Sequence, residues 1–124
     1  MWNKIFVTAV FASFAWSIYL VVGVVIGADY ALTRAAGGQF ASFPTYIRFI
    51  YLINTAFIIW QTIVYIRLLQ KKSIKPIWSL KLFIILGILG TIANAASRSS
   101  DERLNVIPLL ITTLVFWNNR NKIN

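Results

Sequence analysis

A run of 24 residues with no charged side chain, residues 5–28, lies close to the start of the chain. A helix needs about 20 apolar residues to cross the hydrocarbon core of a bilayer. The apolar core of a secretory signal peptide is shorter, roughly 7–15 residues. The run therefore predicts a retained transmembrane helix. We expect residues 28–36 to prolong this helix beyond the bilayer, and Gly37-Gly38 to end it, because glycine adopts the left-handed C-terminal conformation cheaply.

Three further apolar segments follow, over about residues 44–69, 77–97 and 100–118. The whole chain is 59% hydrophobic and only 12% charged, so lipid is a better solvent for it than water. We predict an all-α fold, an integral membrane bundle of four transmembrane helices that forms one domain over residues 1–124. The last segment is the shortest, because residues 104–117 make only about 21 Å of helix. Its capped start at Ser100 lengthens it, and Pro108 falls in an early turn, where a missing amide hydrogen costs less.

Charged residues are distributed unequally between the two sides that such a bundle would have. Four crossings put both termini and the second loop on one side, where we count eight basic residues and no acid. Cytoplasmic segments carry the excess of Lys and Arg, so both termini are predicted to be cytoplasmic. The basic side holds Lys4, Arg67, Lys71, Lys72, Lys75, Lys81, Arg120 and Lys122, and the other side holds Arg34, Arg48, Arg98, Arg103, Asp29, Asp101 and Glu102.

The net charge of +9 bears on the partners of the chain. In a soluble protein such a charge would suggest nucleic acid. Here the basic residues lie at the ends of apolar segments, which indicates membrane lipids as partners, not nucleic acid.

A polar turn, residues 87–108, separates the last two apolar segments. Ser99 and Glu102 have the spacing of a capping box, which starts a helix. Before it, Gly87, Gly90 and Asn94 recur at helical spacing and predict the close approach of a neighbouring helix.

Catalytic chemistry finds little support in the sequence. The chain has no cysteine and no histidine, which excludes disulfides, thiol catalysis and the usual proton shuttle. Asp101 and Glu102 are adjacent, and successive helical residues do not face each other, which suits capping better than acid–base work. We therefore expect no enzyme, no cofactor and no metal.

A candidate binding site remains at the predicted outer end of the bundle. There Asn54 would lie about 9 Å below Arg48, and Asn94 about 6 Å below Arg98. Arginines above amides suit an anionic head group or a small anion. The alternative is that Asn54 and Asn94 bond each other or a backbone carbonyl and only hold helices together. The candidate cluster consists of Asp29, Arg48, Asn54, Asn94, Arg98, Asp101, Glu102 and Arg103.

The run over residues 94–103, NAASRSSDER, resembles an N-x2-SRS-x2-ER run between the third and fourth helices of a group of uncharacterised small four-helix proteins of the bacterial inner membrane. The resemblance implies a multi-pass protein of the bacterial plasma membrane and no particular activity. The length is also similar to that of small multidrug-resistance transporters, but the first apolar run lacks their carboxylate. Motifs of the four-helix fluoride channels are not found.

We predict a small non-enzymatic integral membrane protein that binds a protein or lipid partner, in an accessory or immunity-like role. The alternative is a small transporter or channel, formed by a homo-oligomer, that uses the outer Arg/Asn site. Flux into proteoliposomes separates the two predictions.

Overall fold

The computed structural model describes residues 4–32, 34–35, 40–76, 78–97 and 99–120, and this part of the chain is helical without strands. The predicted all-α fold class is thus confirmed for these residues. The elements are α1 (Lys4–Ile26), the 3-10 helix η1 (Asp29–Ala31), α2 (Thr45–Leu69), α3 (Ser79–Ala95), α4 (Ser100–Arg103) and α5 (Val106–Asn118).

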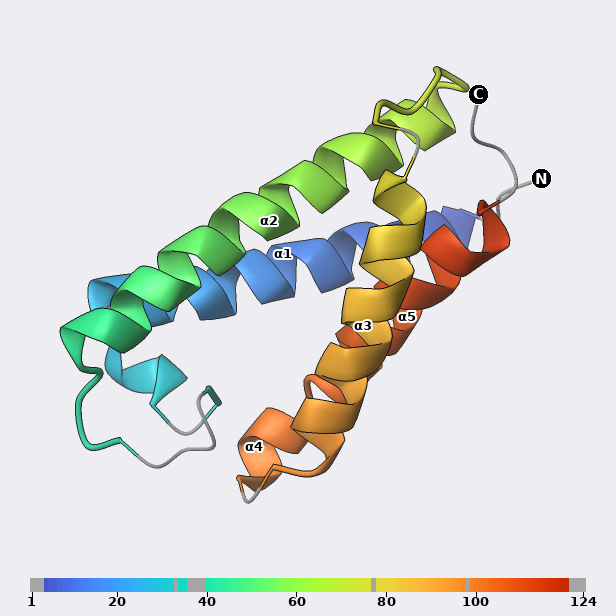
Figure 1. The fold of residues 1–124 in the computed structure, drawn as a ribbon. Helices are drawn as coiled ribbons and strands as arrows, with labels where there is room; N and C mark the ends of the chain where they lie inside the picture. The colour runs from blue at the N-terminus through green and yellow to red at the C-terminus, as the bar shows by residue number, and fades with distance from the viewer. Residues whose placement is uncertain (1–3, 33, 36–39, 77, 98, 121–124) are drawn as a thin grey trace.

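The four long helices form two pairs joined along one seam (Figure 1). Helix α1 packs against α2 and α5, and α3 packs against α5. Helices α2 and α3 meet at their connecting loop and diverge from it, so that their other ends lie apart (Figure 1). The start of α1 and the end of α5 lie at the same end of the molecule as this loop (Figure 1). We call this the loop end, and the opposite end, which holds η1 and α4, the far end.

Helix α1 stops earlier than the sequence suggested, at Ile26. Gly27 has φ +73°, the Ala28 amide donates to the Gly23 carbonyl (2.8 Å), and the Gly27 amide donates to the Val24 carbonyl (3.1 Å). These two bonds make a Schellman motif, which satisfies the last carbonyls of a helix. The predicted extension over residues 28–36 is therefore wrong, because the chain turns at Gly27 and forms η1. The expected stop at Gly37-Gly38 lies outside the described residues.

The segment after α1 folds back over the helix that precedes it. The Tyr30 hydroxyl donates to the Tyr19 carbonyl (2.7 Å), and the two rings stack with centroids 4.3 Å apart. Gly23 makes room for the Tyr30 ring, since a Cβ at Gly23 would lie 2.5 Å from it. Burial, and secondarily the neighbouring Tyr19, raise the pKa of the Tyr30 phenol above its ordinary value.

The predicted single helix over residues 100–118 is two helices, α4 and α5, separated at Leu104 and Asn105. Pro108 gives the physical reason. In a continuous helix its ring would clash with the Leu104 carbonyl and leave that carbonyl without a donor. A fresh start at Val106 places Pro108 in a first turn, where amide hydrogens have no partner within the helix.

Close packing of α3 on α5 follows from the small residues that the sequence highlighted. A Cβ at Gly87 would overlap the Thr113 side chain on α5, whereas one at Gly90 would lie 3.7 Å from Leu109. The Thr91 hydroxyl donates to the Gly87 carbonyl (2.7 Å), which leaves it no need of a partner on another helix. The predicted close approach is confirmed at Gly87.

An aromatic cluster forms the core near the loop end. Phe83 lies 4.9 Å from Phe116 and 4.8 Å from Trp60 between ring centroids, and Phe14 lies 6.0 Å from Tyr65. Apart from the half-buried Trp60, these side chains are buried. Rings from α1, α2, α3 and α5 meet here, so this aromatic cluster holds the α1–α2 pair against the α3–α5 pair.

Two helices, α1 and α2, are long and apolar enough to cross a membrane. Core helices of soluble proteins and signal sequences can be equally long and apolar. The buried share of each helix helps to distinguish a core helix from a helix whose apolar side chains face outward. Only 11% of the apolar window of α2 is buried inside the molecule, against 39% for α1. Most of α2 therefore presents apolar side chains outward, which is unlike a core helix.

Candidate functional site

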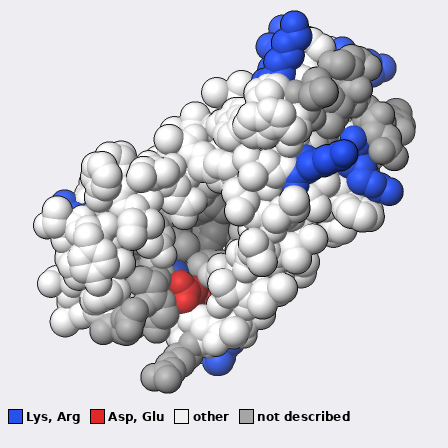
Figure 2. All heavy atoms as spheres, viewed as in Figure 1, with Lys and Arg blue, Asp and Glu red and all other residues white. Residues whose placement is uncertain are grey.

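A cavity of about 540 Å³ lies between α2 and α3 and is backed by α1 and α5. It results from the divergence of α2 and α3, which leaves the space between them unfilled. In Figure 2 it is a hollow in the surface of the molecule, with acidic atoms at its edge. Side chains from α4 and from the segment after η1 also line it, so nearly every helical element contributes to its wall.

The wall formed by α2 carries two amide side chains, Asn54 and Gln61. They are seven residues apart and therefore lie on one face, with Phe57 and Ile58 between them. Both amides are half-buried, and neither has a hydrogen-bond partner among the described residues. The same is true of the Ser17 hydroxyl on the α1 wall. Their polar atoms are not fully buried, so a molecule inside the cavity can supply the partners that the described residues do not.

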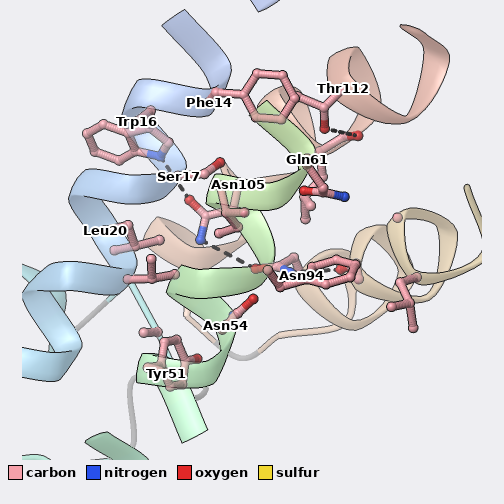
Figure 3. A pocket seen from close by; sticks show the side chains of 18 of the residues that line it. Phe14, Trp16, Ser17, Leu20, Tyr51, Asn54, Gln61, Asn94, Asn105 and Thr112 are labelled. Atoms are coloured by element: carbon pink, nitrogen blue, oxygen red, sulfur yellow. Dashed lines mark hydrogen bonds between the residues drawn. The ribbon is translucent and has the colours of Figure 1, made fainter. Parts of the chain in front are cut away.

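The opposite wall is organised by Asn105, which lies in the turn between α4 and α5 and is 7% exposed. Its Oδ1 accepts a hydrogen bond from the Trp16 indole (3.2 Å), and its Nδ2 donates to the Arg34 carbonyl (3.1 Å) and to Asn94 Oδ1 (3.4 Å). Figure 3 shows this chain of side chains beside the cavity. One amide thus joins α1, α3 and the segment after η1.

Asn105 was not among the residues selected from the sequence. The signal that could have found it is its place three residues before Pro108, because proline in the first turn of a helix predicts a break just before it. An asparagine at such a break can turn its side chain inward.

Two charged residues of opposite sign, Arg34 and Glu102, are among the described lining residues. Both lie close to Asn105: its amide binds the Arg34 carbonyl, and its own backbone N–H donates to the Glu102 carbonyl (2.9 Å). The Arg34 guanidinium donates to the Tyr30 carbonyl (3.2 Å). Among the described lining residues, the two charged ones therefore belong to the far end of the cavity, and the others are uncharged.

Of the eight predicted site residues, the cavity brings together three, Asn54, Asn94 and Glu102. Asn54 and Asn94 thus line the same cavity, but they do not bond each other. Asn94 donates to the Gly90 carbonyl of its own helix (2.7 Å) and accepts from Asn105, while Asn54 faces the cavity. The alternative, that Asn94 bonds a backbone carbonyl, is the one observed.

The remaining predicted residues have other positions. The Arg48 Nε donates to the Val25 carbonyl (2.8 Å) at the end of α1, and the Arg103 guanidinium donates to the Ser97 carbonyl (3.2 Å). The expected ring of arginines above the amides is therefore not formed by these two residues. Asp29 begins η1, and Asp101 lies in the first turn of α4. Arg98 lies outside the described residues.

Half of the predicted capping box is observed at the start of α4, where the Ser99 side chain is the N-cap. The Glu102 amide donates to the Ser99 hydroxyl (3.3 Å), and the Ser99 amide donates to the Ser97 hydroxyl (3.1 Å). Asp101 and Glu102 therefore lie at the positive end of a short helix, where acids are stabilised. Among the described residues no group of three metal-ligating side chains lies together.

Comparisons with models of known protein families, with curated proteins and with solved structures gave no match. The resemblance of the run over residues 94–103 to small bacterial inner-membrane proteins stays a prediction.

Proposed function

We propose that this chain is an integral membrane protein of four crossings that binds a lipid or another amphipathic molecule in the cavity between α2 and α3. One observation carries the binding role: the amides of Asn54 and Gln61 face a cavity without partners among the described residues. At membrane depth a polar group without a partner indicates a functional site.

The outer surface supports the membrane location. Large apolar side chains are exposed along α2 and α3, among them Phe49 at 64%, Ile53 at 62% and Leu89 at 57%. Soluble monomers rarely expose contiguous apolar patches larger than a few hundred Å². Lipid chains would cover this surface without an energetic penalty, so the apolar exterior favours a bilayer over water as the solvent.

Charge supports the orientation with both termini in the cytoplasm. Basic atoms gather at the loop end (Figure 2), to which the α2–α3 loop contributes Lys71, Lys72 and Lys75. All three acids of the chain belong to the far-end segments, Asp29 in η1 and Asp101 and Glu102 in α4. The positive-inside rule therefore places the loop end in the cytoplasm and the far end of the cavity outside.

Labelling with a membrane-impermeant maleimide tests this orientation, because the chain has no cysteine of its own. We expect Arg103→Cys to react in intact cells and Lys72→Cys to react only after permeabilisation. The reverse pattern would contradict the orientation, and recovery of the chain in the soluble fraction would contradict the membrane location.

The closed inner end of the cavity favours binding over conduction. Among the described residues, the rings of Phe14, Trp60, Phe83 and Phe116 pack together on the side of the cavity nearer the loop end, and they are apolar. A site that is polar at mid-depth and sealed on one side can hold a ligand, whereas a pore needs both ends open.

Native mass spectrometry of the protein released from mild detergent tests the binding role. We expect wild-type protein to retain at least one lipid-sized molecule that the double variant Asn54→Leu/Gln61→Leu loses. Thr62→Val is the matched control on α2, because the Thr62 hydroxyl bonds the Ile58 carbonyl and does not line the cavity. Equal retention by all three proteins would contradict the proposal.

A small transporter is the second candidate, and the depth of Gln61 favours it. Gln61 is the seventeenth residue of the 25-residue helix α2, so the cavity reaches past the middle of the bundle. Opening the aromatic cluster would then connect the two sides. Solute flux into proteoliposomes that is lower for the Asn54→Leu variant than for wild-type protein would support transport. If wild-type protein retains lipid but shows no flux, binding alone is supported.

A further inference from the structure

We infer that the ligand of the cavity is an uncharged amphipathic molecule with ester and hydroxyl groups, of the monoacylglycerol type. This inference rests on the proposed function and names the class of ligand for that site. It follows from the charge, the hydrogen-bonding capacity and the access route of the cavity.

The charge of the described cavity wall is balanced. Arg34 and Glu102 are its charged members, and they lie together at the far end. Arg34 already donates to the Tyr30 carbonyl, and Glu102 has interactions of its own. An ion in a low-dielectric site needs an opposite charge or several hydrogen bonds to offset its lost hydration. Because the described part of the wall carries one charge of each sign and no net charge, it fits a ligand without net charge.

The hydrogen-bonding groups of the cavity are both donors and acceptors. Asn54 and Gln61 each carry an N–H₂ group and a carbonyl oxygen, and Ser17 carries a hydroxyl. A ligand that has only acceptors would leave the amide oxygens unmatched, and a hydrocarbon would leave all of these groups unmatched. Ester carbonyls accept from the amide N–H groups, and free hydroxyls donate to the amide oxygens, so a molecule with both satisfies the wall.

The spacing of these groups gives the direction of the ligand. Asn54 and Gln61 are seven positions apart, which is about 10 Å along the axis of α2. Apolar side chains, Phe57, Ile58 and Leu20, line the cavity near them. An elongated molecule that lies parallel to α2, with apolar and polar parts side by side, fits this pattern.

The opening of the cavity faces the proposed bilayer. Ile50 and Ile53 on α2 and Leu86 on α3 line the cavity and are also exposed on the outer surface, at 54%, 62% and 40%. The edges of the opening are therefore the same side chains that lipid would contact, so a lipid-soluble ligand can enter sideways. A volume of about 540 Å³ is that of a site for one small amphipathic molecule.

The test uses Trp16, which lines the cavity, as the reporter. The protein in phosphatidylcholine nanodiscs is titrated with a brominated monoacylglycerol or with a brominated phosphatidylglycerol. The fluorescence of the Trp16→Phe variant, measured in the same way, is subtracted so that only the emission of Trp16 remains. We expect saturable quenching by the monoacylglycerol. The half-saturating mole fraction should rise about 2- to 13-fold in Asn54→Leu and in Gln61→Leu, the loss of one hydrogen bond each, and stay unchanged in Thr62→Val.

The outcomes separate the inference from the proposed function. Saturable quenching by phosphatidylglycerol at the same or a lower mole fraction would overturn the uncharged ligand and leave the lipid-binding role intact. Unsaturable quenching by both lipids would overturn both. Saturable quenching that neither leucine variant changes would overturn the role of the amides.

Discussion

Replacing Asn105 by alanine should cost more stability than any other single amide replacement among the described residues. Its side chain makes three hydrogen bonds that join different segments, to Trp16, to the Arg34 carbonyl and to Asn94. Side-chain bonds between helices in membranes average about 0.6 kcal/mol and reach about 1.7 kcal/mol. Three such bonds predict a loss of about 2 kcal/mol from the free energy of unfolding.

Unfolding in mixed micelles with increasing dodecyl sulfate, followed by circular dichroism, measures this loss. Asn119→Ala is the matched control, because Asn119 is also buried, at 2% exposure, but donates to the Val115 carbonyl of its own helix. The control should lose about 0.6 kcal/mol. Equal losses in the two variants would refute the view that Asn105 joins separate segments.

Trp16 gives a second readout of the same perturbation. Its indole N–H donates to Asn105, and its ring is 39% exposed. Without this bond the indole should change its environment, so we expect Asn105→Ala to shift the Trp16 emission, again after subtraction of Trp16→Phe. An unchanged emission together with full stability would show that the Asn105 bonds do not form in the membrane.

Three glycine substitutions test the packing in the same unfolding assay. Gly87→Ala should lose about 1–3 kcal/mol, because the added methyl overlaps Thr113. Gly90→Ala has 3.7 Å to Leu109 and should gain about 0.5–1 kcal/mol of helix propensity, so equal effects at the two positions would contradict the α3–α5 contact. Gly27→Ala should lose about 1 kcal/mol, since its φ of +73° is unfavourable for a residue with a Cβ, and an unchanged midpoint would mean that α1 does not end there.

Helix positions were largely predictable, because long uncharged runs and their polar boundaries define them. The second segment, predicted over residues 44–69, is Thr45–Leu69, and the first, predicted over residues 5–28, is Lys4–Ile26. The end of the first helix was not predictable in the same way, because Gly27 lies within the uncharged run. A glycine there suits either a helix contact or a helix end, and only its backbone angle, φ +73°, decides between them.

The site was predictable in part. Asn54 was a candidate from the sequence, and Gln61 shares its face by helical periodicity, so the polar side of α2 can be derived from the sequence. The partners of the arginines were not predictable, since Arg48 has a long side chain and bonds the Val25 carbonyl, which lies at the unexpectedly early end of α1. Asn105 was hidden because its role depends on the break before Pro108, which turns the side chain toward α1 and α3.

The choice of amides for the cavity follows from the cost of placing polar groups in a bilayer. A charged residue at the centre of a membrane helix costs about 2.5–3.5 kcal/mol on insertion scales. This chain keeps charges out of the middle of its long helices, since the basic residues of α2 and α3 are Arg48, Arg67 and Lys81, all within four residues of a helix end. The mid-helix positions Asn54 and Gln61 instead carry uncharged groups that both donate and accept hydrogen bonds. Such helices can insert at low cost and still leave two amides facing the cavity, which is the combination that a receptor for an uncharged membrane-soluble ligand requires.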